Sequence, residues 1–196
     1  MARRDDVIAF LDDLLDAGSW EDYGPNGLQV PGAEDVSLVV TGVSAHRDLF
    51  ERAAGEGAQL VLCHHGLFWR NQPRQIDARM KERLKALFDS DMSLAAYHLP
   101  LDAHPEVGNN ALLCEALGLE RSEPFGTLNG RAIGFVGRAP EPIARDELVD
   151  RCTRALDREP LVFDGGPDRI ETVGIVSGGG ASSLSEAIEL GLDAFL

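Results

Sequence analysis

A short apolar segment that ends at two adjacent histidines constrains the fold of this chain most strongly. Residues 60–63 have the length and composition of a buried strand, and His64, His65 and Gly66 follow directly. Because neighbouring side chains on a strand point to opposite faces, adjacent histidines converge only where the strand has ended. Open α/β sheets bind ligands at the carboxyl ends of their strands. The segment therefore predicts an α/β fold with an imidazole-lined site.

Neutral imidazole is a good ligand for zinc, iron, nickel or manganese, so His64 and His65 are candidate metal ligands. The alternative is a pair of loop histidines that make hydrogen bonds and bind no metal. A metal site needs further donors, and carboxylates are the expected partners.

The segments around the histidine pair are typical of a strand–helix–strand unit. Residues 36–43 predict a strand and residues 47–56 a helix, which leads to the strand ending at His64. A right-handed parallel crossover is the expected geometry. Residues 5–17 predict an amphipathic helix, capped by Asp5 at its start and by Gly18 at its end. Residues 23–30 form a turn-rich loop, which we interpret as a connector.

A second strand end carries more candidate ligands. Residues 75–90 predict a helix that buries Met80, Leu84, Leu87 and Phe88, and residues 93–97 predict the strand that follows it. This strand ends at His98, with Asp102 and His104 just beyond. In a parallel sheet both strand ends lie at one edge, so Asp102 can supply an anionic ligand, and a carboxylate can also bridge two cations.

His98 and His104 are candidates for ligation or proton transfer. The alternative for Asp102 is a turn or capping role ahead of a helix over residues 107–117, and for His98 a hydrogen bond to the backbone. We favour the metal site because two successive strand ends carry histidines.

The remainder of the chain resembles the first part faintly. Residues 131–137, 161–163 and 171–177 predict strands, and residues 144–156 and 182–190 predict helices. A shift of 134 positions aligns Val39 with Val173, Ala53 with Ala187, Gly57 with Gly191 and Val61 with Phe195. We therefore predict an α/β fold of two similar, duplicated halves, with mixed sheets flanked by helices and an incomplete second half. The expected domains are residues 1–124, carrying the metal ligands, and residues 125–196.

Composition limits the partners and the compartment. The formal net charge of −15 argues against a nucleic acid or an anionic membrane as the main partner. Cys63, Cys114 and Cys152 form no CxxC pattern, so we expect reduced thiols and a cytoplasmic protein. The sequence has neither a signal-peptide pattern nor about 18 consecutive apolar residues.

Several motifs together resemble one family. They are His64-His65-Gly66-Leu67-Phe68-Trp69, Tyr97-His98-Leu99-Pro100-Leu101-Asp102-Ala103-His104-Pro105, Gly108-Asn109-Asn110, Asn26-Gly27-Leu28-Gln29 and Asp193-Ala194-Phe195-Leu196. With them the chain resembles the Nif-three-like dinuclear-metal-centre hexameric proteins, also called GTP cyclohydrolase 1 type 2 homologues. The resemblance extends over essentially the whole chain.

The resemblance implies a toroidal homohexamer with two divalent metal ions per subunit, held in part by His64, His65 and Asp102. Relatives complete this site with a histidine and a glutamate on a later segment, so we expect the given sequence to be truncated. The implied activity is that of a metal-dependent hydrolase, in which activated water attacks a small molecule, with the ring carbon of a nucleotide such as GTP as one candidate. His98 would move protons. The alternative is a metal-binding toroidal scaffold or metal-handling protein without turnover.

Overall fold

The computed structural model describes residues 1–196 and divides the chain into two compact units, Met1–Leu101 and Asp102–Leu196. The change in sequence character placed the boundary later, after residue 124. The difference arises because helix α5 (Asn109–Ala116) and strand β7 (Glu120–Leu128) pack with the second sheet. A helix of five residues, α4 (Leu99–Ala103), spans the division.

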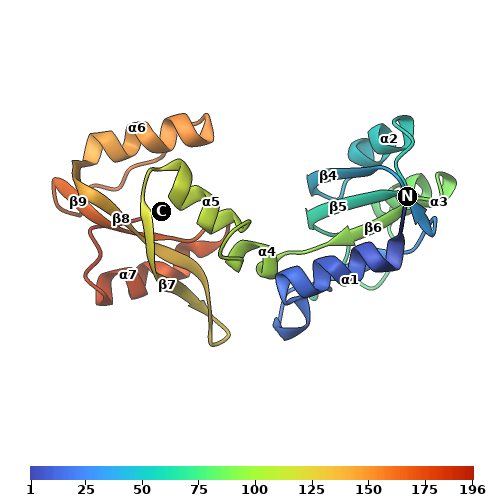
Figure 1. Ribbon diagram of the computed structural model, residues 1–196, viewed down its shortest axis with the longest axis horizontal. Coiled ribbons are helices and arrows are strands. Elements are labelled where there is room, and N and C mark those ends of the chain that lie inside the picture. The colour runs from blue at the N-terminus through green and yellow to red at the C-terminus, as the bar shows by residue number, and fades with distance from the viewer. The chain divides into compact units, whose positions relative to one another are not determined.

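The first unit contains a mixed four-stranded sheet in the order β2-β6-β5-β4 (Figure 1). Strands β4, β5 and β6 are parallel, and β2 runs antiparallel to β6. Their bounds are β2 Gly27–Val30, β4 Val39–Ser44, β5 Leu60–His65 and β6 Ser93–Ala96. A small antiparallel pair, β1 (Ala2–Arg3) with β3 (Asp35–Val36), accompanies this sheet. The predicted parallel strand–helix–strand unit is confirmed.

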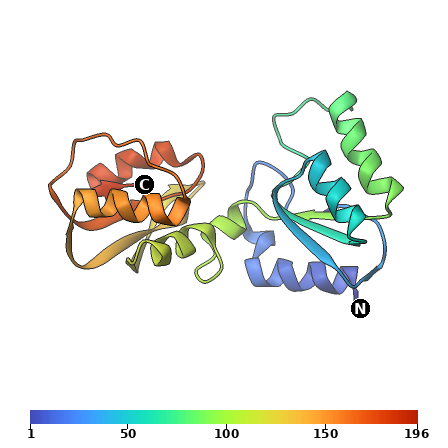
Figure 2. The ribbon, with the colours of Figure 1, turned by 90° about the horizontal axis from the view of Figure 1, so that it is seen from above.

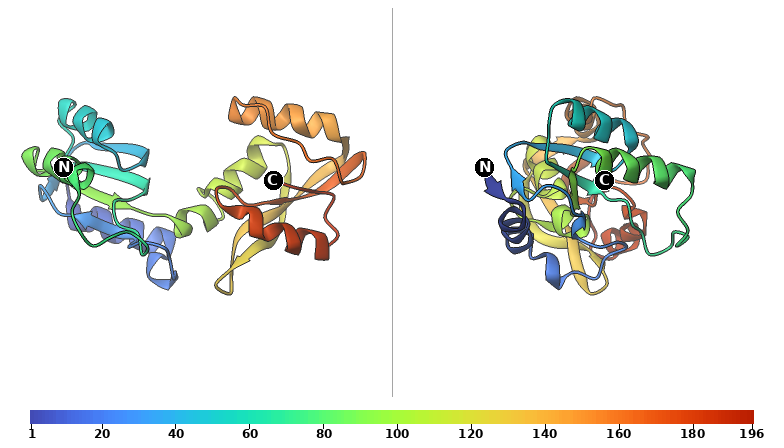
Figure 3. Two further views of the ribbon diagram at one scale, coloured as in Figure 1. Left: turned by 180° about the vertical axis from the view of Figure 1, so that it is seen from behind. Right: turned by 90° about the vertical axis from the view of Figure 1, so that its right-hand side faces the viewer.

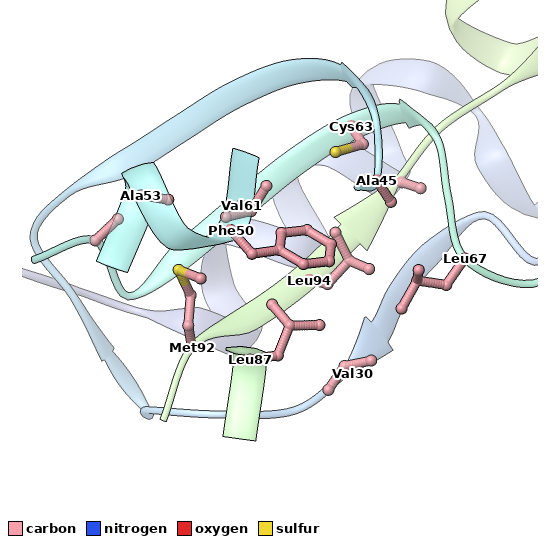
Figure 4. Packing of buried hydrophobic residues seen from close by; sticks show 12 residues of the cluster. Val30, Ala45, Phe50, Ala53, Val61, Cys63, Leu67, Leu87, Met92 and Leu94 are labelled. Atoms are coloured by element: carbon pink, nitrogen blue, oxygen red, sulfur yellow. The ribbon is translucent and has the colours of Figure 1, made fainter. Parts of the chain in front are cut away.

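Helices cover both faces of this sheet. Figure 2 shows α2 (Arg47–Gly55) and α3 (Ala78–Asp89) on one face and α1 (Arg4–Leu15) on the other. Phe50 of α2 is fully buried against Val61 and Leu94 of the sheet and Leu87 of α3 (Figure 4). Burial of a side chain of this size stabilises the fold by about 1.5–3 kcal/mol. The apolar faces predicted for these helices therefore form the core.

Two details of the predicted helices are wrong. The first helix is capped by neither Asp5 nor Gly18: it begins at Arg4, and Asp16 ends it in the left-handed conformation, with a φ of 49°. The 3-10 turn η1 (Ala17–Ser19) follows. Phe88 is 62% exposed, because α3 turns only a narrow face, centred on Leu87, towards the sheet.

The second unit contains another mixed four-stranded sheet, in the order β10-β9-β8-β7. Helices α5 and α6 (Arg145–Leu156) pack on one face, and Figure 3 shows α7 (Leu184–Glu189) on the opposite one. The strands β8 (Arg131–Ala144), β9 (Arg169–Ile175) and β10 (Ala194–Phe195) complete the sheet, and the 3-10 turn η2 (Gly180–Ser183) precedes α7. The chain therefore has a mixed α/β fold with mixed sheets flanked by helices.

The sequence prediction missed strand β7 and placed a strand wrongly at residues 161–163. Strand β7 forms a hairpin with β8 through Asn129 and Gly130, which both have positive φ. Asn-Gly is the strongest short signal for such a turn. In the segment 161–163, Leu161 and Phe163 are more than four-fifths exposed and lie outside both sheets.

The strand–helix–strand segments of the two units have the same register. Val39 pairs with Leu60 in the first unit, and Val173 pairs with Ala194 in the second, each partner being shifted by 134 positions. Both pairings are parallel. The helix between the strands also ends alike, since the amide of Ala58 donates to the carbonyl of Ala53 as that of Leu192 donates to Ala187.

A side-chain oxygen that accepts hydrogen bonds from two consecutive backbone amides also recurs with the shift of 134 positions. In the first unit, Oε1 of Gln59 accepts hydrogen bonds from the backbone amides of Ser37 and Leu38, at 3.0 and 3.1 Å. In the second, Oδ2 of Asp193 accepts from the amides of Glu171 and Thr172, both at 2.9 Å. The repeat seen weakly in the sequence therefore extends to individual hydrogen bonds.

None of the helices combines the length and the apolar character needed to cross a bilayer.

Candidate metal centre

Parallel pairing of β5 and β6 brings their histidines together. The pairing of β5 with β6 ends at Cys63 and Ala96. Strand β5 continues to His65, which pairs with Ser44 of β4, so His64 and His65 are the last residues of the strand and do not follow it as predicted. The ring centroid of His64 lies 4.5 Å from that of His65 and 5.0 Å from that of His98. One ring nitrogen from each of the three lies within 4.8 Å of the others, which allows this cluster to hold a metal ion. We call these three residues the histidine cluster.

The Nδ1 atoms of the cluster face oxygen partners. Nδ1 of His64 lies 3.0 Å from the carbonyl oxygen of Tyr97, which can only accept, so Nδ1 carries the proton. Nδ1 of His98 lies 2.7 Å from Oδ1 of Asp22, and Nδ1 of His65 lies 3.4 Å from the hydroxyl oxygen of Ser44. A protonated Nδ1 places the lone pair on Nε2, the arrangement that metal-binding histidines usually show.

Asp22 is a buried carboxylate beside the cluster, and the sequence prediction missed it. Its side chain is 1% exposed. Burial alone raises the pKa of Asp22, but hydrogen bonds from His98, the amide of Leu99 and the side chain of Asn26 lower it below its ordinary value. The carboxylate is therefore ionised at neutral pH.

Residues 23–30, which we interpreted from the sequence as a connector, accept hydrogen bonds from the segments that follow β5 and β6. Oδ1 of Asn26 accepts a hydrogen bond from the amide of His98 at 2.9 Å, and Oε1 of Gln29 accepts one from the amide of Leu67 at 2.8 Å. A Cβ atom at Gly66 would collide with the Gln29 side chain. The side-chain amides of Asn26 and Gln29, next to the glycines of this segment, were the available signal for this role.

An open cavity of about 1120 Å³ adjoins the cluster within the first unit. Asp22, Tyr23 and Trp69 line it, and the ring of Trp69 lies 5.1 Å from that of His98 and 5.8 Å from that of His65. Cavities of this size accept small organic molecules. The cavity therefore borders the cluster through Asp22 and Trp69, and none of the three histidines lines it.

The other predicted site residues lie in the second unit. Oδ1 of Asp102, a residue that is 7% exposed, accepts hydrogen bonds from Nδ2 of Asn109 at 2.7 Å and from the hydroxyl of Ser177 at 3.5 Å. Its assignment as a metal ligand stays a prediction. Nδ1 of His104 accepts from the amides of Glu106 and Val107, both at 3.1 Å, which is a turn-capping role.

Known proteins match this chain over nearly its whole length. The family described as Duf34/NIF3 (NGG1p interacting factor 3) matches residues 2–196. The chain belongs to this family. A GTP cyclohydrolase 1 type 2 homolog of Deinococcus radiodurans is 38% identical over 193 residues, which cover 98% of this chain and 73% of the relative. A protein of the same name from Pseudomonas aeruginosa is 42% identical over 190 residues, covering 97% and 75%.

A solved structure shows the same architecture. It is titled protein ybgI, of unknown function, and it superimposes with a TM-score of 0.93 at 36% identity, over 99% of this chain and 77% of that one. The donor set of this NIF3 chain fits a transition metal, because three imidazoles suit zinc, iron, copper or nickel.

Proposed function

We propose that this NIF3-family chain is a divalent-metal-dependent hydrolase with a dinuclear centre. His64, His65 and Asp102 would hold two ions of zinc, iron, manganese or nickel. The observation that carries the proposal is the convergence of three imidazoles, with Nδ1 of His64 held by a carbonyl and Nδ1 of His98 by a carboxylate. When bound, the cations supply Lewis acidity that activates water for attack on carbon or phosphorus.

His98 is the residue we assign to proton transfer. Its side chain is 20% exposed, so water and substrate can reach it, while its Nδ1 atom is engaged by Asp22. The remaining nitrogen, Nε2, can take up a proton and return it to a leaving group. Trp69, which meets the His98 ring edge-on at 83°, shields one side of the imidazole.

The substrate in this proposal is a small molecule with a planar ring, and a nucleotide ring carbon is the specific candidate. The curated relatives carry the name GTP cyclohydrolase 1 type 2 homolog. The cavity beside the cluster offers aromatic side chains for stacking, among them Trp20, Tyr23 and Trp69. Arg70 and Arg74 also line it, but the lining carries a net negative charge because it includes five carboxylates, those of Asp12, Asp13, Asp16, Glu21 and Asp22.

The second candidate is a metal-binding scaffold or metal-handling protein without turnover. The histidine cluster favours it equally, since binding a metal needs only the donors. In both cases we propose assembly into a toroidal homohexamer with the metals facing its interior. We further infer that the matching registers of Val39 with Leu60 and Val173 with Ala194 arise from duplication of one half.

Metal content and turnover separate the two candidates. We would purify the chain, its Asp102→Asn variant and its His46→Gln variant without chelator and measure metal per subunit. His46 is a matched control because its Nδ1 accepts a hydrogen bond from the amide of Leu49, at the start of α2 and outside the cluster. Turnover would be measured on GTP and on simple phosphoesters.

A hydrolase predicts metal and turnover in the chain and in His46→Gln, with turnover lost in Asp102→Asn. A scaffold predicts bound metal without turnover in every sample. Absence of metal from all three samples, even after incubation with zinc or manganese, would overturn both candidates.

A further inference from the structure

We infer that Asp22 is a positioning residue that fixes the tautomer of His98 and so presents the Nε2 lone pair of this histidine to the cluster. The tautomer follows from hydrogen-bond geometry alone. Its consequence for metal binding or proton transfer rests on the proposed function, because both roles need the lone pair on Nε2.

Four donors surround the Asp22 carboxylate. Oδ1 accepts from the amide of Tyr23 at 2.6 Å and faces Nδ1 of His98 at 2.7 Å. Oδ2 accepts from Nδ2 of Asn26 at 3.0 Å and from the amide of Leu99 at 2.9 Å. With a side chain that is 1% exposed, Asp22 depends on these protein partners.

Three of the four donors cannot reverse their role. Two are backbone amides, of Tyr23 and Leu99, which only donate. The third is Nδ2 of Asn26, whose orientation is fixed because its Oδ1 accepts from the amide of His98. Only the imidazole of His98 can be a donor in one tautomer and an acceptor in the other. An ionised carboxylate offers only acceptors, so it selects the tautomer with the proton on Nδ1.

Replacing Asp22 by asparagine therefore makes a specific prediction. With its amide nitrogen at the Oδ2 position, the new side chain would place a donor against two other donors, Nδ2 of Asn26 and the amide of Leu99, and neither would have an acceptor there. At the Oδ1 position the amide nitrogen would oppose only the amide of Tyr23, provided that His98 changes tautomer and accepts at Nδ1. The second arrangement leaves fewer donors without a partner. Asp22→Asn should thus move the His98 proton from Nδ1 to Nε2.

The test is a long-range nitrogen–proton NMR spectrum of the histidine side chains in metal-free protein. We would record it at about pH 8.5, above the ordinary imidazole pKa of about 6.5, and assign the His98 signals with His98→Gln. The matched control is Asp12→Asn, which removes a carboxylate that also lines the cavity and accepts from the hydroxyl of Tyr97 at 2.7 Å. The Asp12 carboxylate makes its hydrogen bond to Tyr97 and none to His98.

We expect the Nδ1-protonated form of His98 in the unaltered chain and in Asp12→Asn, and the Nε2-protonated form in Asp22→Asn. The inference is overturned by an Nε2 proton in the unaltered chain, by an unchanged tautomer in Asp22→Asn, or by the same change in both variants. The unaltered chain alone can give the first of these results, so the inference stays testable even if Asp22→Asn does not fold.

Zinc affinity, measured by competition with a chromophoric chelator, tests the consequence separately. Partners of metal-bound histidines affect affinity about 10–100-fold, so Asp22→Asn should bind zinc weaker by that factor where His98 joins His64 and His65 as a ligand. Where His98 serves in proton transfer alone, Asp22→Asn should keep the zinc affinity of the unaltered chain, and Asp12→Asn should match the unaltered chain in both cases. If the unaltered chain binds no zinc but the tautomers behave as expected, the proposed function fails and the role of Asp22 stands. If zinc binds tightly and the tautomer of Asp22→Asn is unchanged, only the role of Asp22 fails.

Discussion

The Nδ1 atom of His64 lies 3.0 Å from the carbonyl oxygen of Tyr97, the residue directly before His98. The end of β6 therefore orients a histidine of β5 and also carries the next histidine of the cluster. This relationship depends on the parallel pairing of the two strands, in which Cys63 stands opposite Ala96. A slip of one residue would turn the His64 ring to the other face of the sheet.

Replacing His64 by glutamine should abolish tight metal binding. The variant loses one of three converging imidazoles, and we expect zinc affinity to fall by more than about 100-fold, the upper end of effects seen for partners outside the ligand shell. Chelator competition measures the change. The control is His104→Gln, which removes an imidazole that accepts from two turn amides in the second unit. An equal loss in both variants would contradict a cluster-specific site.

The contact between Gly66 and Gln29 should appear as strong coupling in a double-mutant cycle. A Cβ at Gly66 meets the Gln29 amide, which is held by the amide of Leu67 and by the carbonyl of Pro25. We expect Gly66→Ala to lower the free energy of unfolding by about 1–3 kcal/mol in the unaltered chain. In a Gln29→Ala background the same change should cost much less.

Urea unfolding followed by the fluorescence of Trp20 and Trp69, both in the first unit, measures these free energies. Gly18→Ala is the control, since nothing lies near a Cβ there. Additive effects of Gly66→Ala and Gln29→Ala would show that the two positions do not interact.

Asp193 should make the second unit sensitive to acid. Burial raises the pKa of Asp193. Hydrogen bonds from the amides of Glu171 and Thr172 and from the Thr172 hydroxyl lower this pKa by more than burial raises it, so the pKa in the folded protein lies below the ordinary value. A depressed pKa stabilises the fold fully above the unfolded pKa of about 3.9, and this contribution is lost as the pH falls through the folded pKa.

Urea unfolding followed by circular dichroism at several pH values tests this expectation. The stability difference between the unaltered chain and Asp193→Asn should be constant near neutral pH and shrink below about pH 4. Asp168→Asn, at a carboxylate whose side chain is 95% exposed, is the control and should show little pH-dependent difference. A difference for Asp193→Asn that does not change with pH would refute the role of the charge.

The three thiols should resist alkylation in the folded protein. Cys63, Cys114 and Cys152 are buried, and burial raises the pKa of Cys114 to about 11. Because the thiolate is the reactive form, iodoacetamide at about pH 8 should label none of them within minutes and all three in urea. Mass spectrometry counts the labels. Rapid labelling of Cys114 in the native state would contradict the buried position.

Much of the first unit could be predicted because its signals are local. The apolar run of β5 and the helix periodicity of α2 report burial directly, and the order strand–helix–strand implies parallel pairing. Strand β7 was missed because its residues 120–123 are exposed and polar, without the alternation that marks a half-buried strand, and a proline follows them. Phe88 was misplaced because an apolar periodicity does not say how wide a face the neighbouring elements cover.

The sequence by itself determined that His64, His65 and His98 lie at or just beyond the carboxyl ends of strands, because strand composition and the abrupt change to polar residues are encoded within about ten positions of each other. The tertiary structure alone decided which atoms meet. Asp22 is 76 positions from His98, and Gln29 is 38 positions from Leu67. A buried polar group takes whichever partner the packing brings within about 3 Å, and packing joins segments whose separation along the chain carries no signal of their contact.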